Sequence, residues 1–207
     1  MTKNKARWTE AYLKKRQASP ASRPPSSQYR HVEIRETLAA MSFRKCFYCE
    51  RKLAESEGEV DHVMEVAERP DLAFAWENLC WACRECNRKK QPNARIPLAD
   101  CLDPCNNIDL PEDHLSFEDE YIRSRYGSFK GSQTIRKYHL DREQLNYLRV
   151  KQLREFDRLL RAIRERQLRE GRPGITKLER EFVLSFGQPA HAFSLMFQVY
   201  LAELGWV

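Results

Sequence analysis

Two cysteine pairs are the first residues in this sequence whose type and spacing could do chemistry. Cys46 and Cys49 form one C-x-x-C unit, and Cys83 and Cys86 form another. Two such units in one chain are typical of a tetrahedral zinc site with four thiolate ligands. A redox-active C-x-x-C needs only one pair, beside a strand and helix of thioredoxin type, and neither pair has that setting. We therefore predict one structural zinc ion bound by these four cysteines.

The three other cysteines are assigned less directly. Cys80 lies three residues before Cys83 and competes with it for the zinc site. We expect Cys80 to stay outside, because a Cys80/Cys83 pair would break the five-residue offset between Asn78 and the second C-x-x-C unit. Cys101 and Cys105 have the spacing C-x-x-x-C, which favours free thiols and leaves a second metal site as the alternative.

Polar residues stand between and after the cysteine pairs in a specific order. Asp61 is followed by His62, Asn78 precedes a leucine, and Asn87 directly follows the last cysteine. A neutral histidine can deprotonate water near neutral pH. Carboxylate and amide oxygens suit a hard cation, which binds a scissile phosphate and neutralises the leaving oxygen. The pattern predicts phosphodiester hydrolysis, with His62 as general base and Asp61 and Asn87 as ligands of Mg²⁺ or Mn²⁺.

A strand and a helix are needed to position these groups. The segment VDHVMEV alternates as a strand does, and RECNRKKQ contains no helix breaker before Pro92. A zinc ion held by both cysteine pairs would fix the strand against the helix that carries Asn87. Adjacent side chains on a strand point to opposite faces, so Asp61 and His62 can share a site only if the strand bends or ends there.

The order C-x-x-C, D-H, N-L, C-x-x-C-N, K resembles that of the HNH endonucleases, which have the ββα-metal fold. The resemblance covers residues 46 to about 90 and implies that His62 is the base and Asp61 a metal ligand. It further implies that Asn78 organises the loop that orients the base and that Asn87 is the last of the motif residues. One position departs from the family pattern, because Glu65 stands where a proline is frequent.

Other segments resemble one branch of that family. These are CFYCERKL, the insertion ending in FAWENL, CLDP and QTIRKYHLDREQLNYLR. They look like the HNH nuclease subunit of Septu anti-phage systems and of retron-associated relatives, whose members act beside an ATPase subunit. The resemblance implies an effector nuclease of a bacterial defence complex, in a hetero-complex with an ATPase.

The composition agrees with a partner that is a polyanion. The chain of 207 residues has a net charge of +6, from 36 Lys and Arg and 30 Asp and Glu. No stretch approaches the ~20 apolar residues that a membrane span requires. The first residues lack a secretory apolar core, and seven cysteines are an odd number, which argues against a disulfide framework. We expect a cytoplasmic protein with no membrane contact.

A run of basic residues lies beside the predicted site. Phosphate contacts are expected there, and the alternative for each residue is an exposed position on a solvated helix face. The residues are Arg84, Arg88, Lys89 and Lys90.

The expected fold is α+β and predominantly helical, with a zinc-stapled ββα-metal module between an N-terminal helical arm and a C-terminal helical segment. Residues 1–30 would form a basic helix and a Ser/Pro linker, and residues 31–100 would form the nuclease module. Residues 101–207 would begin with an irregular segment that has possible strands around 120–129. Helices are expected after it at 141–170, 177–185 and 190–204.

Details of the C-terminal helices are also predicted. Asp141 and Gln144 fit a capping box at the start of the longest helix. Tyr147 and Phe156 on that helix are expected in the core. The segment AFSLMFQVYLAELGW is apolar on more than one face, which predicts burial against the long helix or a partner.

Two further functions remain open beside DNA cleavage. The same chemistry could act on structured RNA such as tRNA. A zinc module without catalysis could instead bind nucleic acid or a protein partner, and it would retain zinc without any metal-dependent cleavage.

Overall fold

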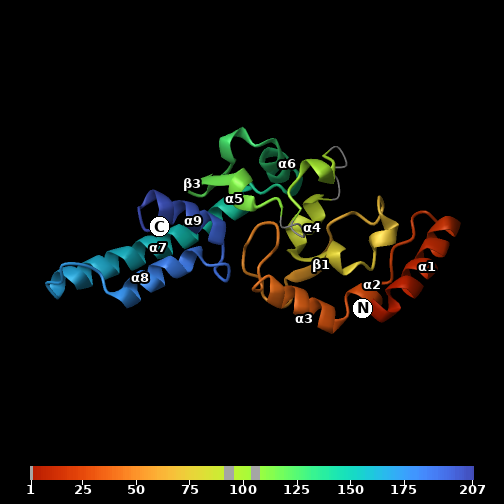
Figure 1. The fold of residues 1–207 in the computed structure, drawn as a ribbon, viewed down its shortest axis with the longest axis horizontal. Coiled ribbons are helices and arrows are strands. Elements are labelled where there is room, and N and C mark those ends of the chain that lie inside the picture. Colours follow the sequence, from red (N-terminus) through yellow and green to blue (C-terminus); the bar gives the residue numbers. More distant parts are fainter. Residues whose placement is uncertain (1, 91–95, 104–107) are drawn as a thin grey trace.

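The computed structural model describes residues 2–90, 96–103 and 108–207 and shows an elongated molecule (Figure 1). Helices α1 (Thr2–Ala18), α2 (Ser26–Tyr29) and α3 (Val32–Met41) lie at one end, and α7 (Glu143–Arg169), α8 (Lys177–Leu184) and α9 (Ser194–Glu203) lie at the other. Helices dominate, and the described strands form small antiparallel pairs. The predicted α+β, predominantly helical class is confirmed.

A strand pair followed directly by a helix forms the centre of the molecule. Strand β1 (Gly58–His62) pairs with β2 (Leu79–Cys83) in a register that places Gly58 opposite Cys83 and His62 opposite Leu79. Helix α4 (Arg84–Lys90) begins where β2 ends. Leu38 of α3 and Trp81 of β2 are buried on this unit. Strand β1 ends at His62. The strand end that Asp61 and His62 need in order to share one site is therefore present.

The segment before the long helix is more regular than the sequence indicated. Strands β3 (Leu115–Glu118) and β4 (Tyr121–Ser124) form a hairpin between α5 (Pro111–His114) and α6 (Phe129–Tyr138). Helix α6 is absent from the sequence prediction because FKGSQTIRKY contains a glycine and β-branched residues of low helix propensity. Tertiary packing stabilises it, since one face is buried and contacts α4 and β4.

Short 3₁₀ turns connect these elements. They are η1 (Pro70–Leu72), η2 (Trp76–Asn78), η3 (Leu98–Asp100), η4 (Arg125–Gly127) and η5 (Ser185–Gly187).

The predicted capping box of the longest helix is wrong. The N-cap of α7 is Arg142, without a side-chain cap. The Arg142 backbone N–H donates to the carbonyl of His139 in the tight turn after α6, so helical geometry begins one residue later than predicted. A capping box does occur at α8, where Thr176 and Glu179 satisfy each other's backbone N–H groups.

The C-terminal helices pack around aromatic rings. Phe156 is buried, with its ring centroid 5.4 Å from that of Phe197 on α9. The predicted burial of the C-terminal segment against the long helix is thus confirmed. The prediction that Tyr147 lies in the core is wrong, since this side chain is 60% exposed and its ring lies beneath the Lys151 ammonium.

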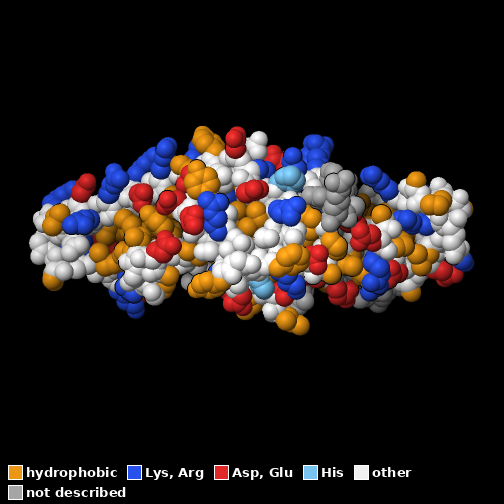
Figure 2. All heavy atoms as spheres, turned by 90° about the horizontal axis from the view of Figure 1, so that it is seen from above, with side chains coloured by type: hydrophobic (Ala, Val, Ile, Leu, Met, Phe, Trp, Pro, Cys, Tyr) orange, Lys and Arg blue, Asp and Glu red, His pale blue; other side chains and the backbone are white. Residues whose placement is uncertain are grey.

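The surface is charged along its length. Lys and Arg side chains are interspersed with Asp and Glu over the face that Figure 2 shows. In the part of the chain that the structure describes, we find no helix with the length and apolarity that a bilayer span demands.

Gly58 generates the first prediction. A Cβ at this position would overlap the Trp81 indole, so Gly58→Ala must displace that ring from the strand pair. We expect a loss of about 1–3 kcal/mol in the free energy of unfolding, measured by urea denaturation. The control is Gly174→Ala, because nothing lies within 4 Å of a Cβ there. Equal stability of the two variants would contradict the close approach.

Candidate active site and metal centre

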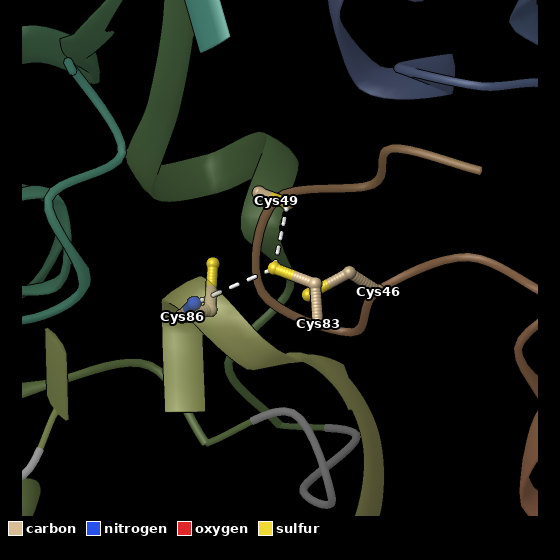
Figure 3. Close-up of side chains that lie close together, drawn as sticks. All are labelled: Cys46, Cys49, Cys83 and Cys86. Carbon is tan, nitrogen blue, oxygen red and sulfur yellow. Dashed lines mark hydrogen bonds between the residues drawn. The ribbon is translucent and has the colours of Figure 1, made fainter. Parts of the chain in front are cut away.

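The two cysteine pairs meet in one buried cluster (Figure 3). The four sulfur atoms of Cys46, Cys49, Cys83 and Cys86 lie within 4.8 Å of one another, and Cys49 Sγ is 4.0 Å from Cys83 Sγ. Zinc–sulfur bonds of ~2.3 Å place tetrahedral thiolates roughly 3.8 Å apart, so the cluster fits a zinc ion. Hydrogen bonds with the thiols of Cys46 and Cys49 lower the pKa of Cys83, which favours the thiolate that zinc binds.

Each pair is positioned by a different type of backbone. Cys46 and Cys49 lie on a tight turn in which the backbone N–H of Glu50 donates to the Cys46 carbonyl and that of Cys46 donates to the Arg51 carbonyl. Cys83 is the last residue of β2, and Cys86 lies in the first turn of α4. A bound ion would therefore join the turn, strand and helix.

The remaining described cysteines lie outside the cluster. Cys80 pairs with Asp61 across the sheet, and its thiol donates to the Tyr48 hydroxyl at 3.3 Å. It is not a member of the four-sulfur group, as predicted. Cys101 is buried near the Pro97 carbonyl. Cys105 falls outside the residues that the structure describes.

Asp61 and Lys90 form a buried ion pair. Lys90 Nζ lies 3.1 and 3.0 Å from the two carboxylate oxygens of Asp61 and also donates to the His62 carbonyl. The Tyr48 hydroxyl donates to the same carboxylate at 2.7 Å. Lys90 is only 2% exposed and Asp61 6%. The ammonium thus lies against the carboxylate that was predicted to bind a cation.

Lys90 therefore differs from the exposed phosphate contact expected of it. The reason is the placement of α4, which begins directly after Cys83 and turns Lys90 toward β1. Arg84, Arg88 and Lys89 are exposed, as both interpretations of the basic run required. Arg84 lies 3.4 Å from Glu59.

The His62 imidazole, the predicted base, is held in one tautomer. Its Nε2 lies 2.9 Å from the Ala73 carbonyl oxygen, which can only accept, so Nε2 carries the hydrogen and Nδ1 keeps a lone pair. Burial lowers the pKa of His62 below its ordinary value, although the Ala73 carbonyl and Asp61 act in the opposite direction. One face of the ring packs on Tyr29, with centroids 4.7 Å apart.

Asn78 closes the loop that follows His62. Its Oδ1 accepts from the backbone N–H of Met64 at 2.6 Å, while its Nδ2 donates to the carbonyls of Met64 and Leu72. The backbone N–H of Val63 donates to the Asn78 carbonyl. The loop therefore begins and ends on one buried asparagine. This geometry fits the loop-organising role that the resemblance implied.

The turn at Glu65 forms without the proline that the family pattern favours. The Glu65 carbonyl accepts from the backbone N–H groups of Glu68 and Arg69. These two bonds close the turn, so a rigid proline ring is not required for it.

Asn87 lies on α4 on the same side as the acidic residues of β1. Its Nδ2 donates to Glu59 at 3.0 Å, which leaves its Oδ1 as the atom suited to a cation. Asn87, Asp61, His62 and Lys90 all line one pocket of about 380 Å³. The structure thus brings together the base and both predicted cation ligands.

The opposite wall of this pocket comes from the N-terminal segment. Arg16, Arg23 and Arg30 line it, together with Tyr29. Arg16 Nη1 donates to the Val66 carbonyl at 2.8 Å and ties α1 to the loop after β1. Sequence reasoning missed these arginines, because the only local signal is a basic helix and nothing in the Ser/Pro-rich run indicates where it packs.

A larger pocket lies away from this chemistry. It has a volume of about 460 Å³, is lined mainly by apolar residues and lies between the first cysteine pair and α9. None of the four predicted catalytic residues lines it. The smaller pocket is therefore the candidate active site.

Comparison with known proteins agrees with the site. Residues 46–93 match the family model described as HNH endonuclease. The Septu protein PtuB of Bacillus thuringiensis is 30% identical over 122 residues, covering 56% of this chain and 45% of that protein. The Septu protein PtuB of Bacillus mycoides (strain KBAB4) is 28% identical over 164 residues, covering 64% and 55%. The chain spans about half the length of these curated relatives.

The cysteine cluster generates the second prediction. Structural zinc contributes roughly 10–16 kcal/mol to the folding of small modules, so Cys83→Ser should abolish stoichiometric zinc binding and cooperative unfolding of the ββα unit. Cys80→Ser is the control, because Cys80 is equally buried but outside the cluster. Zinc per chain is measured by atomic emission and unfolding by circular dichroism. Zinc loss in Cys80→Ser with retention in Cys83→Ser would reverse the assignment.

Proposed function

We propose that this chain, whose residues 46–93 form an HNH endonuclease domain, is a metal-dependent nuclease that hydrolyses phosphodiester bonds in DNA. One observation carries the proposal. A neutral histidine with a lone pair on Nδ1 lies in the same pocket as Asp61 and Asn87, beside a cysteine cluster that fits zinc.

His62 acts as the general base. Its Nδ1 accepts the proton of the attacking water, and the Ala73 carbonyl stabilises the resulting imidazolium through the Nε2 hydrogen. Asn78 keeps Ala73 and His62 in place by closing the loop between them. The low pKa of His62, which burial causes, keeps the base neutral at the working pH.

Asp61 and Asn87 would hold the catalytic Mg²⁺ or Mn²⁺. When bound, such an ion supplies charge stabilisation for the phosphate and the leaving oxygen. Tyr48 and Lys90 fix the Asp61 carboxylate in the pocket through hydrogen bonds to its oxygens. The four cysteines would hold zinc, which positions Asn87 because Cys86 precedes it.

The biological setting is proposed from the relatives. Both are named Septu protein PtuB, and the family resemblance implies an effector nuclease of bacterial anti-phage defence that acts in the cytoplasm beside an ATPase subunit. The net charge of +6 is consistent with a nucleic-acid substrate. We propose DNA as that substrate, and structured RNA such as tRNA is the alternative.

His62→Ala tests the reaction. A positioned general base contributes about 10²–10⁴-fold to a rate, so we expect nicking of supercoiled plasmid in Mg²⁺ or Mn²⁺ to fall by at least about 10²-fold. His31→Ala is the control, because that histidine is exposed and lies outside the pocket. Zinc content should stay that of the wild type in both variants. His62→Ala should lower the melting temperature without preventing folding, because it leaves the Ala73 carbonyl without its partner and Tyr29 without its ring contact.

Three results would contradict parts of this proposal. Undiminished nicking by His62→Ala removes His62 as the base. Zinc retention without any metal-dependent cleavage by the wild type assigns the chain to a non-catalytic zinc module. Cleavage of total RNA but not of plasmid, in parallel reactions, replaces DNA by RNA as the substrate.

A further inference from the structure

The N-terminal segment lies outside the region matched to the HNH family but forms part of the candidate active site. The match begins at residue 46, whereas Arg16, Arg23 and Arg30 line the pocket that holds His62. Helix α1 of this segment contacts η1, which lies in the loop that follows β1. Its packing is specific, because Tyr29 is buried against His62 and Arg16 donates to the Val66 carbonyl. The pocket is thus completed by residues that the family comparison does not assign.

The charge of the pocket favours an anion. Its described lining contains four basic residues, Arg16, Arg23, Arg30 and Lys90, against the two acidic residues Asp61 and Glu65. Asp61 is already paired with Lys90, and Glu65 lies 3.9 Å from the Lys137 ammonium. Two exposed arginines, Arg23 and Arg30, therefore add positive charge that no acidic residue within the described lining balances.

Arg30 is the best placed of these cations. Its guanidinium carbon lies 5.4 Å from the centroid of the Tyr29 ring, and that ring lies 4.7 Å from the imidazole of His62. Tyr29 thus connects the base to the guanidinium through ring contacts. Arg30 is close enough for its charge to act on the His62 imidazole. Within the described residues its side chain makes no salt bridge, unlike Arg69, Arg84 and Arg142.

We propose that Arg30, with Arg23 beside it, binds a backbone phosphate of duplex DNA next to the scissile bond. This inference rests on the proposed nuclease function. A guanidinium presents parallel N–H donors that match two phosphate oxygens, a geometry that a lysine ammonium does not offer. The Tyr29 ring restricts the position of the Arg30 guanidinium, so the arginine side chain loses less conformational entropy when it binds the phosphate.

A duplex is favoured over a single strand by the lining of the pocket. Single-strand sites stack bases on open aromatic rings. The aromatic residues of this pocket are Tyr12 and Tyr29, and both rings are buried, Tyr12 at 3% and Tyr29 at 8% exposure. Without open rings on which bases could stack, the exposed arginines of this pocket favour contacts with the phosphate backbone.

Arg30→Ala and Arg35→Ala form a matched pair of variants. Arg35 is five residues further along the chain, and its guanidinium also lies over an aromatic ring, at 5.8 Å from Trp81. It does not line the pocket. Both variants remove one arginine and one positive charge, and only Arg30 lines the pocket.

Binding is measured separately from cleavage, in the His62→Ala background without added Mg²⁺ or Mn²⁺ and without a chelator that would remove zinc, using a fluorescent DNA duplex. We expect Arg30→Ala to weaken binding about tenfold and to reduce the salt slope of the affinity by about one. Arg35→Ala should bind like its parent. Arg30→Lys should keep the salt slope and regain only part of the affinity, which a purely structural role of Arg30 would not produce.

Equal affinities of the Arg30→Ala and Arg35→Ala proteins would overturn the inference. A selective loss on RNA, with duplex binding unchanged, would overturn it as well. A selective loss for an acidic protein partner with unchanged duplex binding would do the same. If the wild-type protein does not nick plasmid, the proposed nuclease function fails. This outcome is separate from the duplex-binding measurement, which tests Arg30 alone.

Discussion

The meeting of four cysteine sulfurs is the constraint on which the remaining structure depends. The turn of Cys46 and Cys49 and the strand end with Cys83 are far apart in sequence. A zinc ion bound there would add to the cohesion that buried side chains such as Val60, Phe74 and Trp81 provide. It would also fix the start of α4, and with it the direction in which Asn87 and Lys90 point. The catalytic geometry is therefore a consequence of the structural cluster.

The buried pair of Asp61 and Lys90 is the second constraint. Removing both charges from water is costly, and the short contacts of the ammonium with both carboxylate oxygens offset that cost together with the Tyr48 hydroxyl. Tyr48 is in turn stacked on Tyr138 of α6, with centroids 4.1 Å apart. The helix that sequence propensity missed thus supports the carboxylate of the active site. Such a pair contributes orientation more than net stability.

The grouping of the site residues could be predicted from the sequence, whereas their surroundings could not. Ligand type and spacing determine the cysteine cluster, and adjacency places Asp61 and His62 at a strand end, so local pattern was sufficient for both. The burial of Lys90 and the position of Arg30 depend on contacts between segments distant in the chain. Residue spacing carries no information about such contacts. Helix α6 was missed for the same reason, since packing and not propensity stabilises it.

The turn of the first cysteine pair also anchors the C-terminal helices. Glu50, next to Cys49, accepts from the Lys45 ammonium, the Ser194 hydroxyl and the backbone N–H of Leu195. From the other side, Arg142 at the start of α7 donates to the Cys86 sulfur at 3.5 Å. The cluster is thus bound to the C-terminal helices through both of its cysteine pairs. The position of Asn87 and the placement of the C-terminal helices therefore share one support, the two cysteine pairs.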